Sequence, residues 1–111
     1  MVDNESVHPK IAGLLGLAQR ARKIASGEFS VDAAIKEGKA FLVLVAKDAS
    51  DNTKKHFLDK CNYYEIPFLM MGTKESLAKV IGKEERSSVA VLDEGLSQGI
   101  LRYTEESNGK N

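Results

Sequence analysis

The chain of 111 residues has one cysteine, two prolines and no long apolar run. A single cysteine, Cys61, excludes an internal disulfide framework and is typical of the reducing cytoplasm. No stretch approaches the roughly 20 apolar residues that span a bilayer. Residues 1–10 are polar and are not followed by an apolar run of the signal-peptide type. We therefore expect a cytoplasmic protein without a membrane partner.

The sequence also lacks the common catalytic and nucleotide-binding motifs. It contains no P-loop, GxGxxG, GxSxG or HExxH pattern. His8 and His56 are far apart, and Cys61 lies on the apolar side of a predicted helix, where it serves as a small buried residue. Four acidic residues follow strand-like segments, where helix capping accounts for them: Asp48, Asp51, Asp93 and Glu94. We predict a non-catalytic protein with no cofactor, no metal site and no small-molecule substrate.

Charge of one sign does not dominate, because 16 basic residues balance 16 acidic ones. The distribution is nevertheless uneven. Residues 10–23 hold four basic residues and no acid, whereas residues 93–106 hold four acids and a single arginine. Such a basic segment is either an ordinary solvated helix face or a local patch that attracts an anionic partner.

What the sequence does have is a regular alternation of helical and strand-like segments. Helices are expected from Pro9, over about 28–37, after the turn "DASDNT", after Thr73 and over about 94–104. Strands are expected at 24–25, 40–46, 66–71 and 87–93. This order predicts one α/β domain over residues 9–104, with 1–8 and 105–111 as flexible ends. Its sheet is expected to be largely parallel where helical crossovers intervene, with helices on both sides.

Several core positions follow from this pattern. The runs "AFLVLVA" and "IPFLMM" are expected to be strands covered on both faces. The third helix is expected to bury Thr53, Phe57, Cys61 and Tyr64. In the second helix, Phe29 lies about 160° from Val31, which belongs to the apolar face. Phe29 is therefore either exposed or folded back against the preceding loop as a staple.

The combined spacing of several segments resembles a known family. The segments are Gly27, "GKA" at 38–40, "LVLVAKDAS", Cys61, "IPFLMMGTKESLAKVIG" and "VAVLD". Over about residues 9–100 they resemble the ribosomal proteins typified by archaeal L-seven-Ae and eukaryotic L-thirty-e. "ARKIASGE" and "KDASDNTKKHFLDKCNYYEIP" are most similar to the bacterial YlxQ-type branch. The resemblance implies a three-layer α/β/α sandwich with a four-stranded mixed sheet, and RNA binding, in many members to kink-turns.

The residues that contact bases in kink-turn-binding members are mostly replaced here. In those members a Thr-Asn-Glu run follows the glycine, and a lysine follows three residues after the glutamate. The corresponding residues of this chain are Glu28, Phe29, Ser30 and Ala33. Thr73-Lys74 matches the family's Ser-Lys, whereas "KEERSS" is polar where the family loop is usually apolar. Phenylalanine stacks on a base but cannot pair with its edge.

We therefore predict a non-catalytic RNA-binding protein, associated with ribosomes or another structured RNA and present as a monomer. Free N–H groups at Ser26-Gly27 would favour an anion at the start of the second helix. The lysines and the arginine of the candidate set are expected to ring that spot. The candidate residues are Lys23, Gly27, Glu28, Phe29, Ser30, Ala33, Lys39, Lys74, Lys83 and Arg86. The alternative is a protein-interaction module that docks onto a ribosomal, translation or ribosome-assembly protein through Phe29 and Ala33.

Overall fold

The computed structural model describes residues 6–108, with side chains described for residues 6–104. Five helices and four strands alternate in this part of the chain. Their order is α1 (Pro9–Arg20), β1 (Ile24–Ser26), α2 (Glu28–Lys36), β2 (Leu42–Val45), α3 (Asp51–Tyr64), β3 (Phe68–Met70), α4 (Lys74–Val80), β4 (Ser88–Val91) and α5 (Glu94–Asn108). None of these described helices is long and apolar enough to cross a bilayer.

The four strands form one mixed sheet in the order β1-β4-β2-β3. β4 pairs antiparallel with both β1 and β2, and only β2 and β3 pair in parallel. The expectation of a largely parallel sheet is therefore wrong, because β4 runs against the other strands and lies between β1 and β2. This central place explains the apolar runs of β2 and β4, since every residue of both strands is buried.

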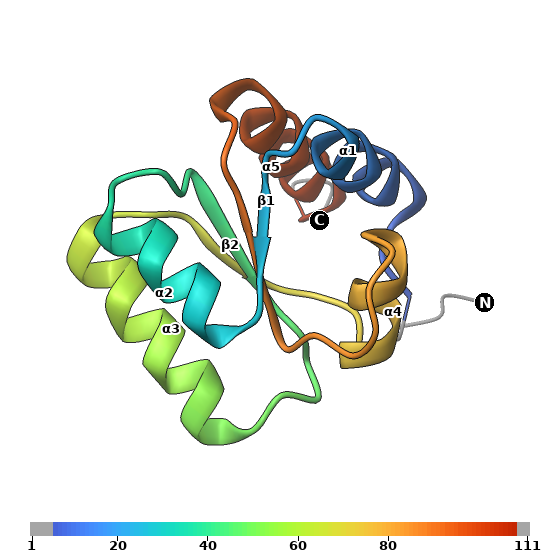
Figure 1. Ribbon diagram of the computed structural model, residues 1–111. Helices are drawn as coiled ribbons and strands as arrows, with labels where there is room; N and C mark the ends of the chain where they lie inside the picture. The colour runs from blue at the N-terminus through green and yellow to red at the C-terminus, as the bar shows by residue number, and fades with distance from the viewer. Residues whose placement is uncertain (1–5, 109–111) are drawn as a thin grey trace.

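Helices cover both faces of the sheet, which confirms the three-layer α/β/α sandwich. Figure 1 shows α2 and α3 on one side and α1, α4 and α5 on the other. Alternate residues of β2 point to opposite faces, so Leu42 and Leu44 pack with α1, α4 and α5 while Val43 and Val45 pack with α2 and α3. The single apolar run of β2 thus contributes side chains to both cores.

Several predicted core positions prove to be partly exposed. The segment 66–71 was expected to be covered on both faces, but β3 is an edge strand and Met70 is 48% exposed. Tyr64 was placed on the core face of α3, and it is 41% exposed. It is the last residue of α3, and the chain turns at Glu65 in a left-handed conformation with φ of 59°. Thr53, also placed on that face, is only partly buried, whereas Phe57 and Cys61 are buried as predicted.

The packed part of the chain begins before Pro9. Val7 is buried in the core beside α1. The backbone N–H of Lys10 donates to Nδ1 of His8 at 3.1 Å, so His8 caps α1. Of the ends predicted to be flexible, residues 1–5 and 109–111 lie outside the described residues, whereas the backbone of 105–108 continues α5.

We expect Cys61 to be unreactive in the folded protein. Burial raises the pKa of its thiol from 9.0 to about 11, so almost no thiolate forms near neutral pH. Alkylation by iodoacetamide at pH 7.5 should therefore be negligible until a denaturant is added, as mass spectrometry of the intact protein would show. Rapid modification without denaturant would contradict the packing of α3 against the sheet.

Candidate functional site

The turn from β1 to α2 is built around Gly27. This residue has φ of 90° and ψ of 153°, a conformation that is essentially restricted to glycine. Its N–H donates to the carbonyl of Ser88 at 3.0 Å, and its carbonyl accepts from the N–H of Val31 at 2.9 Å. The predicted free N–H of Gly27 is thus engaged, because β4 continues to pair with the chain at this point.

The free amides lie one residue further on. No side chain caps α2. The backbone N–H groups of Glu28, Phe29 and Ser30 have no acceptor among the described residues. They carry the positive end of the helix dipole, which favours a negatively charged group such as a phosphate.

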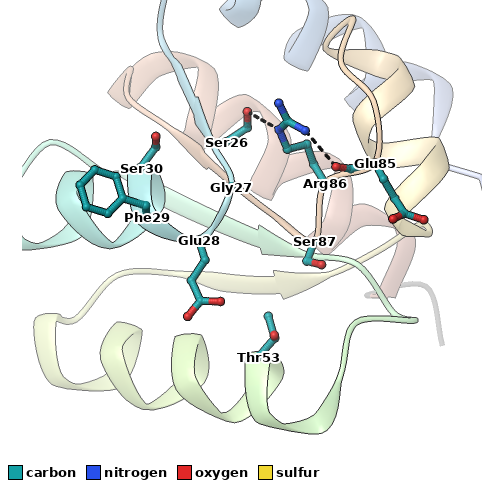
Figure 2. Close-up of a pocket in the computed structure, with 9 residues that line it drawn as sticks. All are labelled: Ser26, Gly27, Glu28, Phe29, Ser30, Thr53, Glu85, Arg86 and Ser87. Atoms are coloured by element: carbon teal, nitrogen blue, oxygen red, sulfur yellow. Dashed lines mark hydrogen bonds between the residues drawn. The ribbon is translucent and has the colours of Figure 1, made fainter.

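A hollow of about 410 Å³ lies beside this helix start (Figure 2). Glu28 reaches from α2 toward Thr53 at the start of α3, whereas Phe29 and Ser30 point to the other side of the turn. The side chain of Phe29 is 87% exposed, so it is not folded back as a staple. The lining residues are Ser26, Gly27, Glu28, Phe29, Ser30, Thr53, Glu85, Arg86 and Ser87.

Arg86 fixes the far wall of the hollow. Its Nε donates to the Ser26 hydroxyl at 3.2 Å, and its Nη1 donates to the carbonyls of Glu84 and Glu85 at 3.2 and 3.0 Å. Its backbone N–H donates to the carbonyl of Lys74 at 3.1 Å. Among the described residues nothing accepts from Nη2, so that end of the guanidinium is available to an incoming anion.

The predicted ring of positive charge is not formed around this turn. Lys23 and Lys39 line a separate hollow, which lies at the opposite end of the sheet. Lys74 and Lys83 do not line the hollow beside Gly27. The backbone N–H of Lys74 instead donates to the carboxylate of Asp48 at 2.8 Å. Sequence spacing missed this separation because β1 places Lys23 and Gly27 at its two ends.

The charged side chains that line the hollow sum to one negative charge. Arg86 contributes one positive charge, and Glu28 and Glu85 contribute two negative ones. Ala33 and Phe29 line a second, smaller hollow of about 290 Å³ on the outward face of α2. The surface therefore offers an exposed ring, three free amides and one partly committed guanidinium rather than a strongly basic patch.

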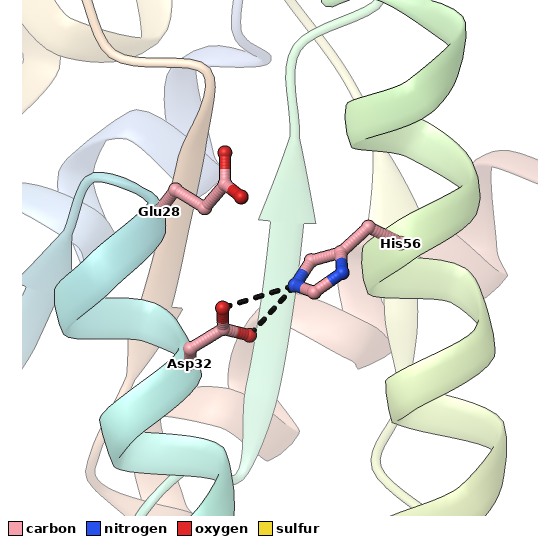
Figure 3. A group of neighbouring side chains, drawn as sticks. All are labelled: Glu28, Asp32 and His56. Carbon is pink, nitrogen blue, oxygen red and sulfur yellow. Dashed lines mark hydrogen bonds and ion pairs between the residues drawn. The ribbon is translucent and has the colours of Figure 1, made fainter.

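One group of possible metal ligands lies next to this hollow. Single ligand atoms of Glu28, Asp32 and His56 all lie within 4.8 Å of one another (Figure 3). Nε2 of His56 is already 2.9 and 3.0 Å from the two carboxylate oxygens of Asp32. The ammonium of Lys60 lies 3.2 Å from Asp32 and would repel a cation. We assign the group to the contact between α2 and α3.

Several of these residues have no signal in the sequence. Asp32 and His56 are 24 residues apart and belong to different helices. Thr53, Glu85 and Ser87 come from α3 and from the loop before β4, and only the folded sheet brings them beside Gly27. No local spacing could have joined them.

Comparison with known proteins agrees with this architecture. Residues 9–101 match the model of a family described as "Ribosomal protein L7Ae/L30e/S12e/Gadd45 family". The chain is 48% identical over 88 residues to RNA-binding protein YlxQ of Bacillus subtilis (strain 168), covering 79% of this chain and 88% of the relative. It is 40% identical over 95 residues to RNA-binding protein YlxQ of Enterococcus faecium, and the match covers 86% of this chain and 91% of the relative.

More distant relatives and a solved structure extend the match. The chain is 26% identical to the large ribosomal subunit protein eL8 of Thermoplasma volcanium, covering 88% of this chain and 82% of the relative. A solved structure of a Bacillus halodurans protein of unknown function superposes with a TM-score of 0.82 at 41% identity. That superposition covers 86% of this chain and 96% of the other. Because the family match spans residues 9–101 and two relatives are 40% or more identical over most of their length, the chain belongs to the ribosomal protein L7Ae/L30e/S12e/Gadd45 family.

Proposed function

We propose that the protein is a non-catalytic RNA-binding protein that binds ribosomal RNA or another structured RNA at the start of α2. The observation that carries the proposal is the 87% exposed ring of Phe29 next to three free backbone amides. Stacking on an unpaired base would remove the surface of this ring from water, which is favourable. Relatives named RNA-binding protein YlxQ support RNA as the ligand. The eL8 relatives, named as ribosomal subunit proteins, support an association with the ribosome.

The proposed mode of binding combines stacking with contacts to phosphate. A base stacks on Phe29, and its phosphate accepts from the amides of residues 28–30 and from Nη2 of Arg86. The Ser30 side chain is short, and its hydroxyl can both donate and accept a hydrogen bond. It therefore discriminates weakly between bases. Selection of a target, a kink-turn included, then depends on the shape of the RNA backbone and on an unstacked base rather than on base edges.

The substitution Phe29→Ala tests this function. Stacking of one base on an aromatic side chain contributes about 1–3 kcal/mol, so the affinity for RNA should fall about tenfold. Purified ribosomal RNA and a synthetic kink-turn RNA would serve as probes, with binding measured by filter retention. Tyr63→Ala removes another ring, 79% exposed at the end of α3, and should leave the affinity unchanged. Equal binding by both variants and wild type would exclude the start of α2 as the RNA site.

A protein-interaction module is the second candidate, because Phe29 and Ala33 together line the outward hollow of α2. The dependence on salt separates the two functions. Binding to RNA phosphates weakens steeply as salt is raised, because counterions are released on binding. Capture of a ribosomal protein or an assembly factor through Phe29 and Ala33 would depend little on salt and would be lost in Ala33→Glu.

A further inference from the structure

The opposite end of the sheet carries a group of side chains that the helices cover only in part. The N–H of Leu92 donates to the carbonyl of Lys23 at 2.8 Å, and the N–H of Phe41 donates to the carbonyl of Val91 at 2.9 Å. The first bond continues the pairing of β4 with β1 by one residue, whereas the second goes to Val91, which already pairs with Leu42. Lys23, Leu92 and Phe41 line one hollow beside these strand ends.

This group is open because α2 stops before it. The neighbouring strand residues Leu42 and Val91 pack with α1, α4 and α5. Alternation along β4 turns Leu92 to the other face, where it packs with the α2–α3 core. α2 ends at Lys36, and the chain turns away at Gly38 with φ of 74°. Phe41 is left 40% exposed.

This opening is a hollow of about 440 Å³, which we call the Phe41 hollow. In Figure 1 it corresponds to the end of the sheet where β1 and β2 begin, away from the start of α2. Its lining joins one aromatic ring to three cations. The lining residues are Arg22, Lys23, Gly38, Lys39, Phe41 and Leu92.

The acidic groups near the Phe41 hollow do not cancel these cations. Glu37 lies 3.3 Å from the ammonium of Lys39, but both side chains are more than half exposed and such pairs are weak. The carboxylate of Asp93, which follows Leu92, accepts from the N–H of Leu96 at 2.8 Å and is held by the start of α5. A phosphate can therefore displace Glu37 and meet three positive charges.

A purely structural role explains only part of this arrangement. Arg22 and Lys23 follow α1, and Lys39 follows α2, so each cation also lies near the negative end of a helix dipole. That role does not require an aromatic ring among them. Phe41 keeps 40% of its surface in water although the chain has an apolar core on both sides of the sheet.

We propose that the Phe41 hollow is a second RNA site that binds a single-stranded segment. A base stacks on Phe41, the guanidinium of Arg22 binds a phosphate, and the ammonium groups of Lys23 and Lys39 bind the same or the adjacent phosphate. This site is separate from the start of α2, and the inference rests on the proposed function only in taking RNA as the ligand. The protein then contacts RNA at both ends of its sheet.

Titration of 15N-labelled protein with hexauridylate tests the site directly. We expect the amide signals of Lys23, Lys39 and Leu92 to shift in wild type and to shift equally in Phe29→Ala. Because Phe29→Ala weakens only the first site, this result would stand even if the start of α2 proved not to bind RNA. Shifts confined to residues 28–30, or no shifts at all, would overturn the proposal.

Two substitutions at Phe41 separate stacking from packing. Phe41→Tyr keeps the ring and should bind hexauridylate as tightly as wild type. Phe41→Leu keeps an apolar side chain but cannot stack, and the affinity should fall at least about fivefold. Fluorescence anisotropy with labelled hexauridylate measures both, and equal affinities for the two variants would show that no base stacks there.

Arg22 offers a test that separates binding from the helix-end role. Arg22 and Glu65 both have left-handed backbones, with φ of 61° and 59°, which glycine adopts without strain. Arg22→Gly and Glu65→Gly should therefore both fold and keep or raise the Tm. Only Arg22→Gly should weaken hexauridylate binding and reduce the salt slope by about 0.7. If Arg22→Gly bound hexauridylate as tightly as wild type, Arg22 would serve only as a cation at the end of α1, and the proposal would be overturned.

Discussion

Replacing Gly27 by alanine is expected to lower the free energy of unfolding by about 1–3 kcal/mol. A Cβ at this position would meet no atom within 4 Å, so the cost is backbone strain rather than a clash. Relief of that strain would move the start of α2 and disturb the bond from the Gly27 N–H to the Ser88 carbonyl. Urea denaturation measures the loss of stability, and filter binding with ribosomal RNA should show weaker binding at the same time.

Gly13→Ala is the matched control for this substitution. Gly13 lies on the exposed side of α1, and an added Cβ there also meets nothing within 4 Å. Alanine is favoured over glycine inside a helix by about 0.5–1 kcal/mol, so Gly13→Ala should stabilise the protein and leave RNA binding unchanged. A Gly27→Ala variant as stable as wild type would mean that the turn does not require a positive φ.

Replacing Phe57 by alanine is expected to cost about 3–5 kcal/mol, a large part of the stability of a small domain. Phe57 is fully buried between α3 and the sheet, and its ring meets that of His56 edge to face at 4.8 Å between centroids. The cavity left by the substitution would loosen the contact of His56 with Asp32 on α2. The midpoint of urea unfolding should therefore fall sharply.

Tyr63→Ala is the control on the same helix. Tyr63 is 79% exposed and contacts the ring of Tyr64, and surface substitutions of this kind usually change stability by no more than about 0.5 kcal/mol. If both variants unfolded at the same urea concentration as wild type, α3 could not be packed on the sheet through Phe57.

The sequence pattern specifies the elements of this fold better than their arrangement. The apolar run around Val43 predicts a buried strand because both faces of β2 are covered. Thr73 predicts the start of α4, and its hydroxyl does accept from the N–H of Ser76. The direction of β4 leaves no such local trace, because a strand buried on both faces has the same composition whether its neighbours are parallel or antiparallel.

The candidate site shows the same division between local and distant information. The outward position of Phe29 follows from helical periodicity, and the structure confirms its exposure. The placement of Lys23 and Lys39 does not follow, because sequence distance does not show which end of a strand a residue occupies. Arg86 is in the hollow as expected, but its bonds to Ser26 depend on a contact between residues 60 positions apart.

The three-residue edge strands limit how this protein can associate with other chains. β1 and β3 form the two edges of the sheet, and the longer strands β2 and β4 are enclosed between them. Each edge offers only a few backbone groups, and Pro67 at the start of β3 has no N–H to donate. Edges of this kind resist strand addition by a foreign peptide and the fibrillar aggregation that can follow. We therefore expect the molecule to resist association through its sheet edges.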